Sequence, residues 1–306
     1  RVLRLKFLLG LFENPYVPED GIEACFDTPD DRAVSQKLAE QSIVLLQNKD
    51  DTLPLRPDIS SIAVIGPNAA EWRNMIGDYA YPAHIEMLKA MKEQHPFDTP
   101  VPDEIGDLED FLPVTTILDG LRNTLSDNVL INYAKGCNIT GQDRSGFDEA
   151  VQAAKTSEVA VCVLGDRSGL VDGCTSGEAR DHTQLGLPGV QEDLLRAVWN
   201  TGTPVVLVLV NARPVELCWA SENVATIVAA WLPGEEGGAA VANTLVGKSV
   251  PGGKLPISFP RDVGQVPVYY NHKPSGGRSH WLGDYIDLSA SPLFPFGHGL
   301  SYTEFE

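Results

Sequence analysis

Residues 159–164 read VAVCVL and residues 205–210 read VVLVLV, two short runs in which every side chain is apolar and many are β-branched. A strand covered on only one face alternates apolar and polar residues, so an uninterrupted run indicates a strand buried on both faces. Three further runs, mainly apolar and rich in β-branched residues, lie at 62–65, 129–133 and 224–230. Together the runs predict a sheet that lies inside the molecule.

Helical patterns separate these strands. Apolar residues recur at helical spacing in four segments between or after the runs, at 115–125, 146–157, 187–200 and 236–247. Strands that alternate with helices predict an α/β fold, in which a mainly parallel sheet carries helices on both faces, as in an α/β sandwich. Such domains bind ligands at the loops that leave the carboxyl ends of their strands. Here those loops follow Ile65, Leu164 and Val210.

The N-terminal part of the chain has a different character. Residues 1–16 begin on an amphipathic helical pattern with no capping residue before it. We interpret this segment as the last helix of an upstream domain, and the chain as a fragment. Residues 17–31, with several Pro, Asp and Glu, predict a linker. The α/β-sandwich domain is expected over 32–306, with helical spacing at 32–47 and an insertion at about 79–112.

The charge balance argues against polyanionic partners. The chain has 23 Lys and Arg against 42 Asp and Glu, a formal net charge of −19. Nucleic-acid binding relies on Lys and Arg that neutralise phosphates, so no nucleic-acid partner is expected. No apolar run reaches the roughly 18 residues that a membrane-spanning helix needs, so no membrane partner is expected either. A neutral ligand such as a sugar suits this surface.

Motifs for metal, nucleotide and serine-hydrolase chemistry are missing from the sequence. The five cysteines form no CxxC pair, and His272 with His280 is read as a solvated loop pair, so no metal is predicted. The glycine clusters that follow strands spell neither GxGxxG nor a Walker loop, and no GxSxG occurs. We therefore predict no cofactor.

The loop after Leu164 is the richest in reactive side chains. It reads GDRSGLVDGCTSGEARDHTQLGLPGVQ over 165–191. A glycosidase needs a carboxylic acid that protonates the departing glycosidic oxygen and later takes a proton from water. Four carboxylates of the loop could serve, namely Asp166, Asp172, Glu178 and Asp181. Composition does not choose among them, and a solvated acidic loop is the simpler alternative.

Blocks of sequence across nearly the whole chain are similar to glycoside hydrolase family 3, the family of many β-glucosidases. SGEARD at 176–181, followed by LGLPGVQ at 185–191, resembles the segment around the acid/base of that family. The other blocks are KFLLGLFENPY (6–16), EQSIVLLQNKDDTLPL (40–55), IAVIGPNAA (62–70), AAWLPGEEGGAAVANTLVGKSVPGGKLPISFP (229–260) and PLFPFGHGLSYTEFE (292–306).

This resemblance implies a two-domain architecture. A TIM-like barrel, largely absent from this chain, supplies the Asp nucleophile, and the α/β-sandwich domain lends a loop with the acid/base Glu. Glu178 matches that Glu. Asp181 matches the Asp of an Asp-Arg pair whose Arg is His182 here, and we expect both residues to support the loop. The nucleophile's Ser-Asp-Trp stretch does not occur in the sequence, so the nucleophile is expected outside this chain.

The implied function is a retaining β-glycosidase that removes terminal β-linked glucose from oligosaccharides, with this chain supplying the acid/base half of the site. Asp166, Arg167 and Ser168 leave the strand on the same loop and are expected to border the sugar, with loop packing as the alternative. A β-xylosidase of the same family is the alternative enzyme. A non-catalytic carbohydrate-binding or scaffolding module is the alternative from another class.

The expected partners are a β-linked oligosaccharide or aryl glycoside and the upstream barrel domain. The sequence leaves open whether the protein also forms a homo-oligomer. It does not fix the compartment either, although a periplasmic or secreted location is favoured over the cytoplasm.

Overall fold

The computed structural model describes residues 1–94, 112–271 and 284–303. Contacts within the chain divide it into two compact units, residues 1–34 and residues 35–306. The first unit holds α1 (Val2–Leu8), a 3-10 turn at Glu23–Cys25 and the start of α2 (Pro29–Ser42). No side chain of α1 is buried, and Arg1 at its N-cap makes no capping hydrogen bond.

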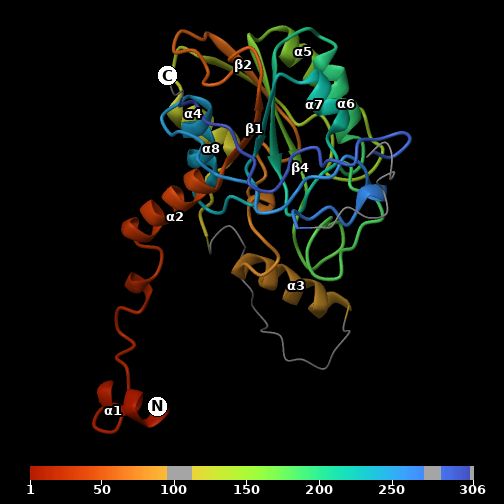
Figure 1. The fold of residues 1–306 in the computed structure, drawn as a ribbon. Coiled ribbons are helices and arrows are strands. Elements are labelled where there is room, and N and C mark those ends of the chain that lie inside the picture. Colours follow the sequence, from red (N-terminus) through yellow and green to blue (C-terminus); the bar gives the residue numbers. More distant parts are fainter. Residues whose placement is uncertain (95–111, 272–283, 304–306) are drawn as a thin grey trace. The chain divides into compact units, whose positions relative to one another are not determined.

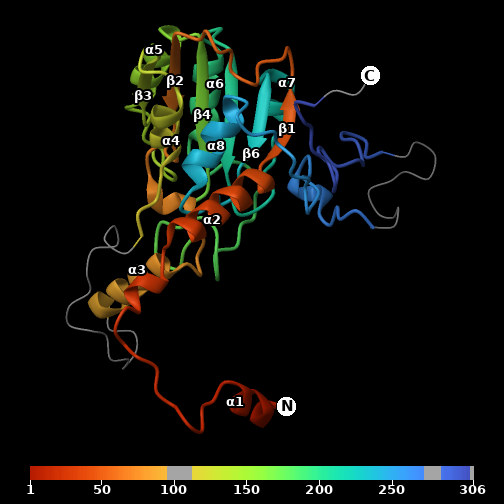
Figure 2. The same cartoon turned by 90° about the vertical axis from the view of Figure 1, so that its left-hand side faces the viewer.

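The second unit is built on a six-stranded sheet in the order β1-β6-β5-β4-β2-β3. The strands are β1 (Val44–Asn48), β2 (Ser61–Ile65), β3 (Leu130–Ala134), β4 (Val159–Gly165), β5 (Val205–Val210) and β6 (Thr226–Ala229). Strands β2 to β6 pair in parallel, whereas β1 pairs antiparallel with β6 at one edge. Figure 2 shows them side by side, from β3 on the left to β1 on the right. The predicted mainly parallel sheet is confirmed.

Helices cover both faces of this sheet, as predicted. On one side lie α4 (Ile117–Thr124) and α8 (Gly237–Leu245), joined by the end of α2. On the other side lie α5 (Phe147–Lys155), α6 (Gln191–Trp199) and α7 (Cys218–Asn223). In Figure 1 the two groups of helices stand to the left and right of the strands. The unit is therefore an α/β sandwich.

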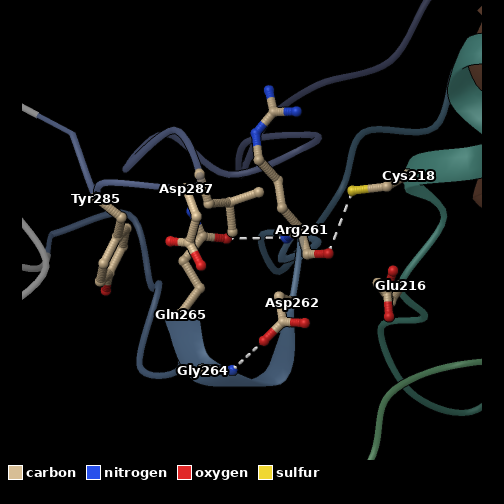
Figure 3. Close-up of a pocket in the computed structure, with 9 residues that line it drawn as sticks. Glu216, Cys218, Arg261, Asp262, Gly264, Gln265, Tyr285 and Asp287 are labelled. Atoms are coloured by element: carbon tan, nitrogen blue, oxygen red, sulfur yellow. Dashed lines mark hydrogen bonds between the residues drawn. The ribbon is translucent and has the colours of Figure 1, made fainter.

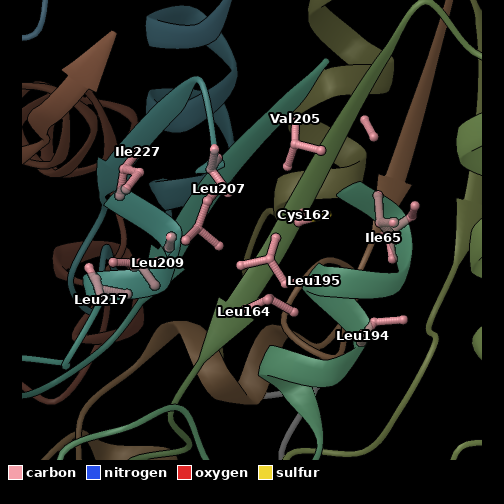
Figure 4. Close-up of a cluster of buried hydrophobic side chains, with 14 of the residues drawn as sticks. Ile65, Cys162, Leu164, Leu194, Leu195, Val205, Leu207, Leu209, Leu217 and Ile227 are labelled. Atoms are coloured by element: carbon pink, nitrogen blue, oxygen red, sulfur yellow. The ribbon is translucent and has the colours of Figure 1, made fainter. Parts of the chain in front are cut away.

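Strands β4 and β5 are apolar throughout because both of their faces are buried. Successive side chains of a strand point to opposite faces, so both sets must meet a helix layer. Leu207 and Leu209 lie in the same core cluster as Leu194 and Leu195 of α6 on one face (Figure 4), and Val208 belongs to the cluster on the other. Burial of each such side chain contributes about 1.5–3 kcal/mol.

The helical spacing predicted over 32–47 is wrong at its C-terminal end. Helix α2 ends at Ser42, and Val44–Asn48 is strand β1. Ile43 and Leu45 join one core cluster while Val44 and Leu46 join the other, which is the alternation of a strand between two layers. A short apolar run next to a helix fits either periodicity, so the pattern alone was ambiguous.

Three further helical segments belong to the described part of this unit. Within the predicted insertion at 79–112, Tyr81–Gln94 form helix α3, and residues 95–111 lie outside the described residues. A short 3-10 helix, Trp72–Met75, precedes α3, and another lies at Val263–Gln265.

The connections that follow the neighbouring strands β2 and β4 lead to helices on opposite faces of the sheet. After β2 the next helix packed on the sheet is α4 on one face, whereas after β4 it is α6 on the other. Adjacent parallel strands that diverge in this way leave a crevice at their carboxyl ends, the usual ligand position of open α/β sheets. The loops over 66–80 and 166–190 both begin there.

Gly165, the last residue of β4, is predicted to tolerate no side chain. Its φ is +143°, and an added Cβ would lie 1.9 Å from the Val210 carbonyl oxygen of the adjacent strand. We expect Gly165→Ala to lower the free energy of unfolding by at least about 3 kcal/mol, measured by urea or thermal unfolding. The matched control is Gly202→Ala, where φ is +82° but no atom lies within 4 Å of the added Cβ. Its expected cost is about 1 kcal/mol, and equal losses in the two variants would contradict the prediction.

Candidate active site

The loop after β4 folds back on itself at its base. The Thr175 amide donates to the Arg167 carbonyl oxygen at 2.8 Å, and the Gly169 amide donates to that of Ser176 at 3.0 Å. Ser168 and Ser176 thereby pair like residues of neighbouring parallel strands. These backbone bonds fix the stretch that leads directly into Glu178.

Asp166 lies fully buried beneath this base. Its Oδ1 accepts hydrogen bonds from Thr175 Oγ1 at 3.0 Å and from Arg213 Nη2 at 3.3 Å. Burial raises the pKa of the Asp166 carboxyl, while the Arg213 cation and the Thr175 hydroxyl act in the opposite direction. The contacts of Asp166 are those of a loop anchor.

Arg213 ties the far end of the same loop to its beginning. Besides Asp166, it donates to the carbonyl oxygens of Leu185 at 3.4 Å and Gly186 at 3.1 Å. Arg213 follows β5, so it belongs to one of the three predicted ligand loops, but nothing in the sequence singled it out. One side chain therefore holds two segments of the loop that are about 20 residues apart.

A second ion-pair group joins the loop to α3. One carboxylate oxygen of Glu86 accepts from Nε and Nη2 of Arg73 at 3.0 and 2.8 Å, and the other accepts from Arg167. Arg73 is 4% exposed and also donates to the Ser168 carbonyl oxygen at 2.9 Å. Arg167 and the buried Ser168 thus take part in anchoring the loop, which is the packing alternative named for them above.

Glu178 lies at the tip of the loop and is exposed. The chain turns tightly there, since the Arg180 amide donates to the Gly177 carbonyl oxygen at 3.2 Å and Ala179 adopts a φ of +58°. The Glu178 amide donates to Asp78 Oδ2 at 3.0 Å, and Tyr79 Oη donates to Glu178 Oε2 at 2.8 Å. Both partners come from the loop after β2.

The two residues predicted to support the loop differ in their contacts. Nε2 of His182 lies within hydrogen-bonding distance of the Thr175 carbonyl oxygen, so the tautomer with a proton on Nε2 donates to it. His182 therefore contacts the loop base from this position. Asp181 is exposed, and within the described part of the chain its carboxylate has neither a hydrogen bond nor an ion pair. Support from Asp181 would need a partner beyond those residues.

The structure therefore brings the predicted site residues together in two levels. Asp166, Arg167, Ser168 and His182 belong to the base of the loop, and Glu178 stands at its tip. Sequence reasoning missed five residues that contact this loop from elsewhere in the chain, namely Arg73, Asp78, Tyr79, Glu86 and Arg213. No local pattern marks them, because each acts on a segment that is distant in the sequence.

A separate pocket of about 370 Å³ is lined by residues at the start of α7 and around the turn at 261–265 (Figure 3). It contains none of the predicted site residues. Its polar groups bond largely to one another, as where the Gly264 amide donates to Asp262 Oδ1 at 2.7 Å and Cys218 Sγ donates to the Arg261 carbonyl oxygen at 3.2 Å. Burial and the charges of Asp262 and Glu192 raise the pKa of the Glu216 carboxyl. These contacts are those of loop packing.

The described residues contain neither a metal-binding cluster nor a membrane-spanning helix. Across 1–94, 112–271 and 284–303, no group of three or more His, Cys, Asp or Glu is placed to hold a metal ion. None of the helices described there is long and apolar enough to cross a membrane. His272 and His280 lie outside the described residues.

The chain also matches a known protein family. Residues 43–302 fit the model described as the glycosyl hydrolase family 3 C-terminal domain. The chain belongs to glycoside hydrolase family 3. Similar proteins include a β-xylosidase from Formosa agariphila, 40% identical over 100% of this chain. A periplasmic β-glucosidase from Salmonella typhimurium is 35% identical over 99% of it.

Solved structures agree with this assignment to family 3. A β-glucosidase from Listeria innocua, crystallised in complex with isofagomine, superposes with a TM-score of 0.80 and 30% identity over 100% of this chain. The chain covers 39% of the Formosa protein, 40% of the Salmonella protein and 39% of the Listeria chain. It thus spans about two fifths of the length of its family 3 relatives.

The buried pair of Asp166 and Arg213 predicts a pH-dependent stability difference. In Arg213→Ala the cation that opposes the burial effect is gone, so the pKa of Asp166 rises further above its ordinary value of 3.8. At pH values below 3.8, the Asp166 carboxyl is protonated in both the folded and the unfolded state, so its burial adds no charge penalty to the free energy of folding. As pH rises, the unfolded chain releases its proton while the folded variant must bury an unpaired charge, so the variant loses stability.

We expect Arg213→Ala to cost about 3 kcal/mol at pH 7 and markedly less near pH 4, measured by urea unfolding at both values. The matched control is Arg144→Ala, which removes an exposed pair with Asp193. That control should cost less than about 1 kcal/mol. A cost for Arg213→Ala that does not grow with pH would show that the charge of Asp166 is not involved.

Proposed function

We propose that Glu178 is the general acid/base of a retaining β-glycosidase whose nucleophile lies outside this chain. The observation that carries the proposal is the presentation of Glu178 on an anchored loop. Its carboxylate is exposed at the tip, while Asp166 of the same loop is buried against Arg213. The family position of the Ser-Gly-Glu segment supports the same choice among the four carboxylates.

The proposed reaction has two steps. Protonated Glu178 first donates its proton to the departing glycosidic oxygen while the nucleophilic carboxylate attacks the anomeric carbon. The Glu178 carboxylate then takes a proton from the water that cleaves the covalent glycosyl intermediate. This mechanism places the two carboxyl groups about 5–5.5 Å apart. Such a distance requires a loop with a fixed position, which the contacts of Asp166, Arg213 and Glu86 favour.

The proposed substrate is an oligosaccharide or aryl glycoside with terminal β-linked glucose. β-Xylosides are the second candidate, because the Formosa relative at 40% identity is named a β-xylosidase. The contacts that choose between these sugars are expected from a barrel domain outside the chain. Relatives named for the periplasm and the lysosome favour an exported protein.

Glu178→Ala in the full-length protein tests the acid/base assignment. We expect turnover of an unactivated disaccharide to fall by about 10²–10⁴-fold, because that leaving group needs a proton. A dinitrophenyl glycoside should lose much less in the first step, since its leaving group departs without one. The matched control is Asp172→Ala, another exposed carboxylate of the loop. Disaccharide turnover that survives Glu178→Ala would refute the assignment.

An assay of the isolated chain tests whether it holds half of an active site or a complete one. We expect this 306-residue chain alone to hydrolyse neither aryl β-glucosides nor aryl β-xylosides. Supplying the upstream barrel in the same polypeptide should restore activity and rank the two sugars. Turnover by the isolated chain would place a nucleophile within these residues. Sugar binding without turnover, even with the barrel present, would instead favour a non-catalytic carbohydrate-binding module.

A further inference from the structure

The loop after β2 holds Glu178 at two points, one on its backbone and one on its carboxylate. Asp78 Oδ2 accepts the Glu178 amide at 3.0 Å, and Tyr79 Oη donates to Glu178 Oε2 at 2.8 Å. Gly177 makes this approach possible. A Cβ at that position would lie 3.1 Å from Asp78 Cβ and 2.7 Å from the Gly169 carbonyl oxygen.

The segment that carries Asp78 and Tyr79 is itself fixed from both sides. Before it, the Met75 carbonyl oxygen accepts the Gly234 amide at 2.9 Å, and Met75 is fully buried. After it, Glu86 of α3 binds the buried Arg73 and reaches Arg167 of the β4 loop. Tyr79 therefore approaches Glu178 from a support that does not depend on the loop tip.

We propose that Tyr79 is a positioning residue for Glu178. The Tyr79 hydroxyl occupies Oε2 of Glu178 and leaves Oε1 as the oxygen that exchanges protons with substrate and water. This inference rests on the acid/base function proposed above. In the protonated carboxyl, the oxygen without the proton is the better acceptor. A hydrogen bond from Tyr79 to Oε2 thus places the proton on Oε1. Once that proton has moved to the leaving oxygen, the same Oε1 accepts the proton of water.

The Tyr79 hydroxyl keeps its proton throughout this cycle. Its hydrogen bond to Glu178, followed by the negative charges of Glu178 and Asp78, raises the pKa of Tyr79 above the ordinary value of 10.0. The ring of His84 faces Tyr79 with the centroids 6.0 Å apart. The charged groups that act on the hydroxyl are the carboxylates of Glu178 and Asp78. Tyr79 therefore remains a donor over the acidic and neutral range.

The positioning role has a physical benefit because Glu178 is exposed. A glutamate side chain in water samples several rotamers, and holding it in one costs conformational entropy at each turnover. A hydrogen-bond donor fixed on Oε2 restricts the Glu178 carboxyl to one orientation and selects which of its oxygens reacts. Such pre-orientation lowers the barrier of a proton transfer without the residue touching the substrate.

Tyr79→Phe in the full-length protein tests this role, since it removes only the hydroxyl of a side chain that is 68% exposed. We expect kcat/KM for an unactivated disaccharide to fall about 10-fold, the loss typical of a hydrogen bond to a charged group. For a dinitrophenyl glycoside the first step should fall less than about 3-fold, because its leaving group needs no proton. The matched control, Tyr133→Phe on the edge strand β3, should leave both rates unchanged.

A double variant decides whether Tyr79 acts through Glu178. In a Glu178→Ala background, Tyr79→Phe should change the remaining rate by less than about 2-fold, because coupled residues are not additive. An additive loss in that background, an equal loss on both substrates, or no loss in Tyr79→Phe would each overturn the positioning role. If Glu178→Ala itself left disaccharide turnover intact, the acid/base function would fail instead, so the two failures are distinguishable.

Discussion

The burial of strand β4 between β2 and β5 is the constraint on which the rest of the structure depends. Its residues 160–164 are buried and shared between two helix layers, so a shift in its pairing register would turn each of these side chains to the other layer. Its end at Gly165 is fixed in turn by Gln191 of α6, whose side-chain amide bonds the Gly165 amide and carbonyl groups, each at 2.8 Å. The long loop that follows thus starts and finishes on the same rigid point.

Polar contacts fix the base of the loop that leaves the end of β4. Asp166 with Arg213, and Glu86 with Arg73 and Arg167, lie partly or wholly out of water at the base of the loop. Such buried ion pairs add little net stability compared with apolar packing, because removing the charges from water is costly. Their geometry is directional, however, and it fixes where each loop segment lies. A surface loop gains in this way the positional precision that catalysis requires.

The sheet could be predicted from sequence because its signal is local and strong. Runs such as VVLVLV admit little besides a doubly buried strand, and four of the helices between or after them have clear spacing. Strand β1 was missed because Ile43–Leu46 directly continue a helical pattern, and only the partner strand β6 decides between the two. The contacts of Tyr79, Glu86 and Arg213 join residues tens of positions apart, and no composition or periodicity encodes them. Glu178 was distinguished from three other loop carboxylates by family resemblance alone.

In the proposed mechanism, the position of Glu178 and its proton chemistry have different origins. Position comes from this chain, through the turn at Gly177, the bond to Asp78 and the hydroxyl of Tyr79. A carboxyl that acts first as an acid and then as a base needs a neighbouring charge that changes between the two steps. In the proposed mechanism that changing charge belongs to the nucleophile, which becomes neutral when it is glycosylated. One chain segment can orient the catalyst while another controls its proton, provided that the loop between them is as firmly anchored as this one.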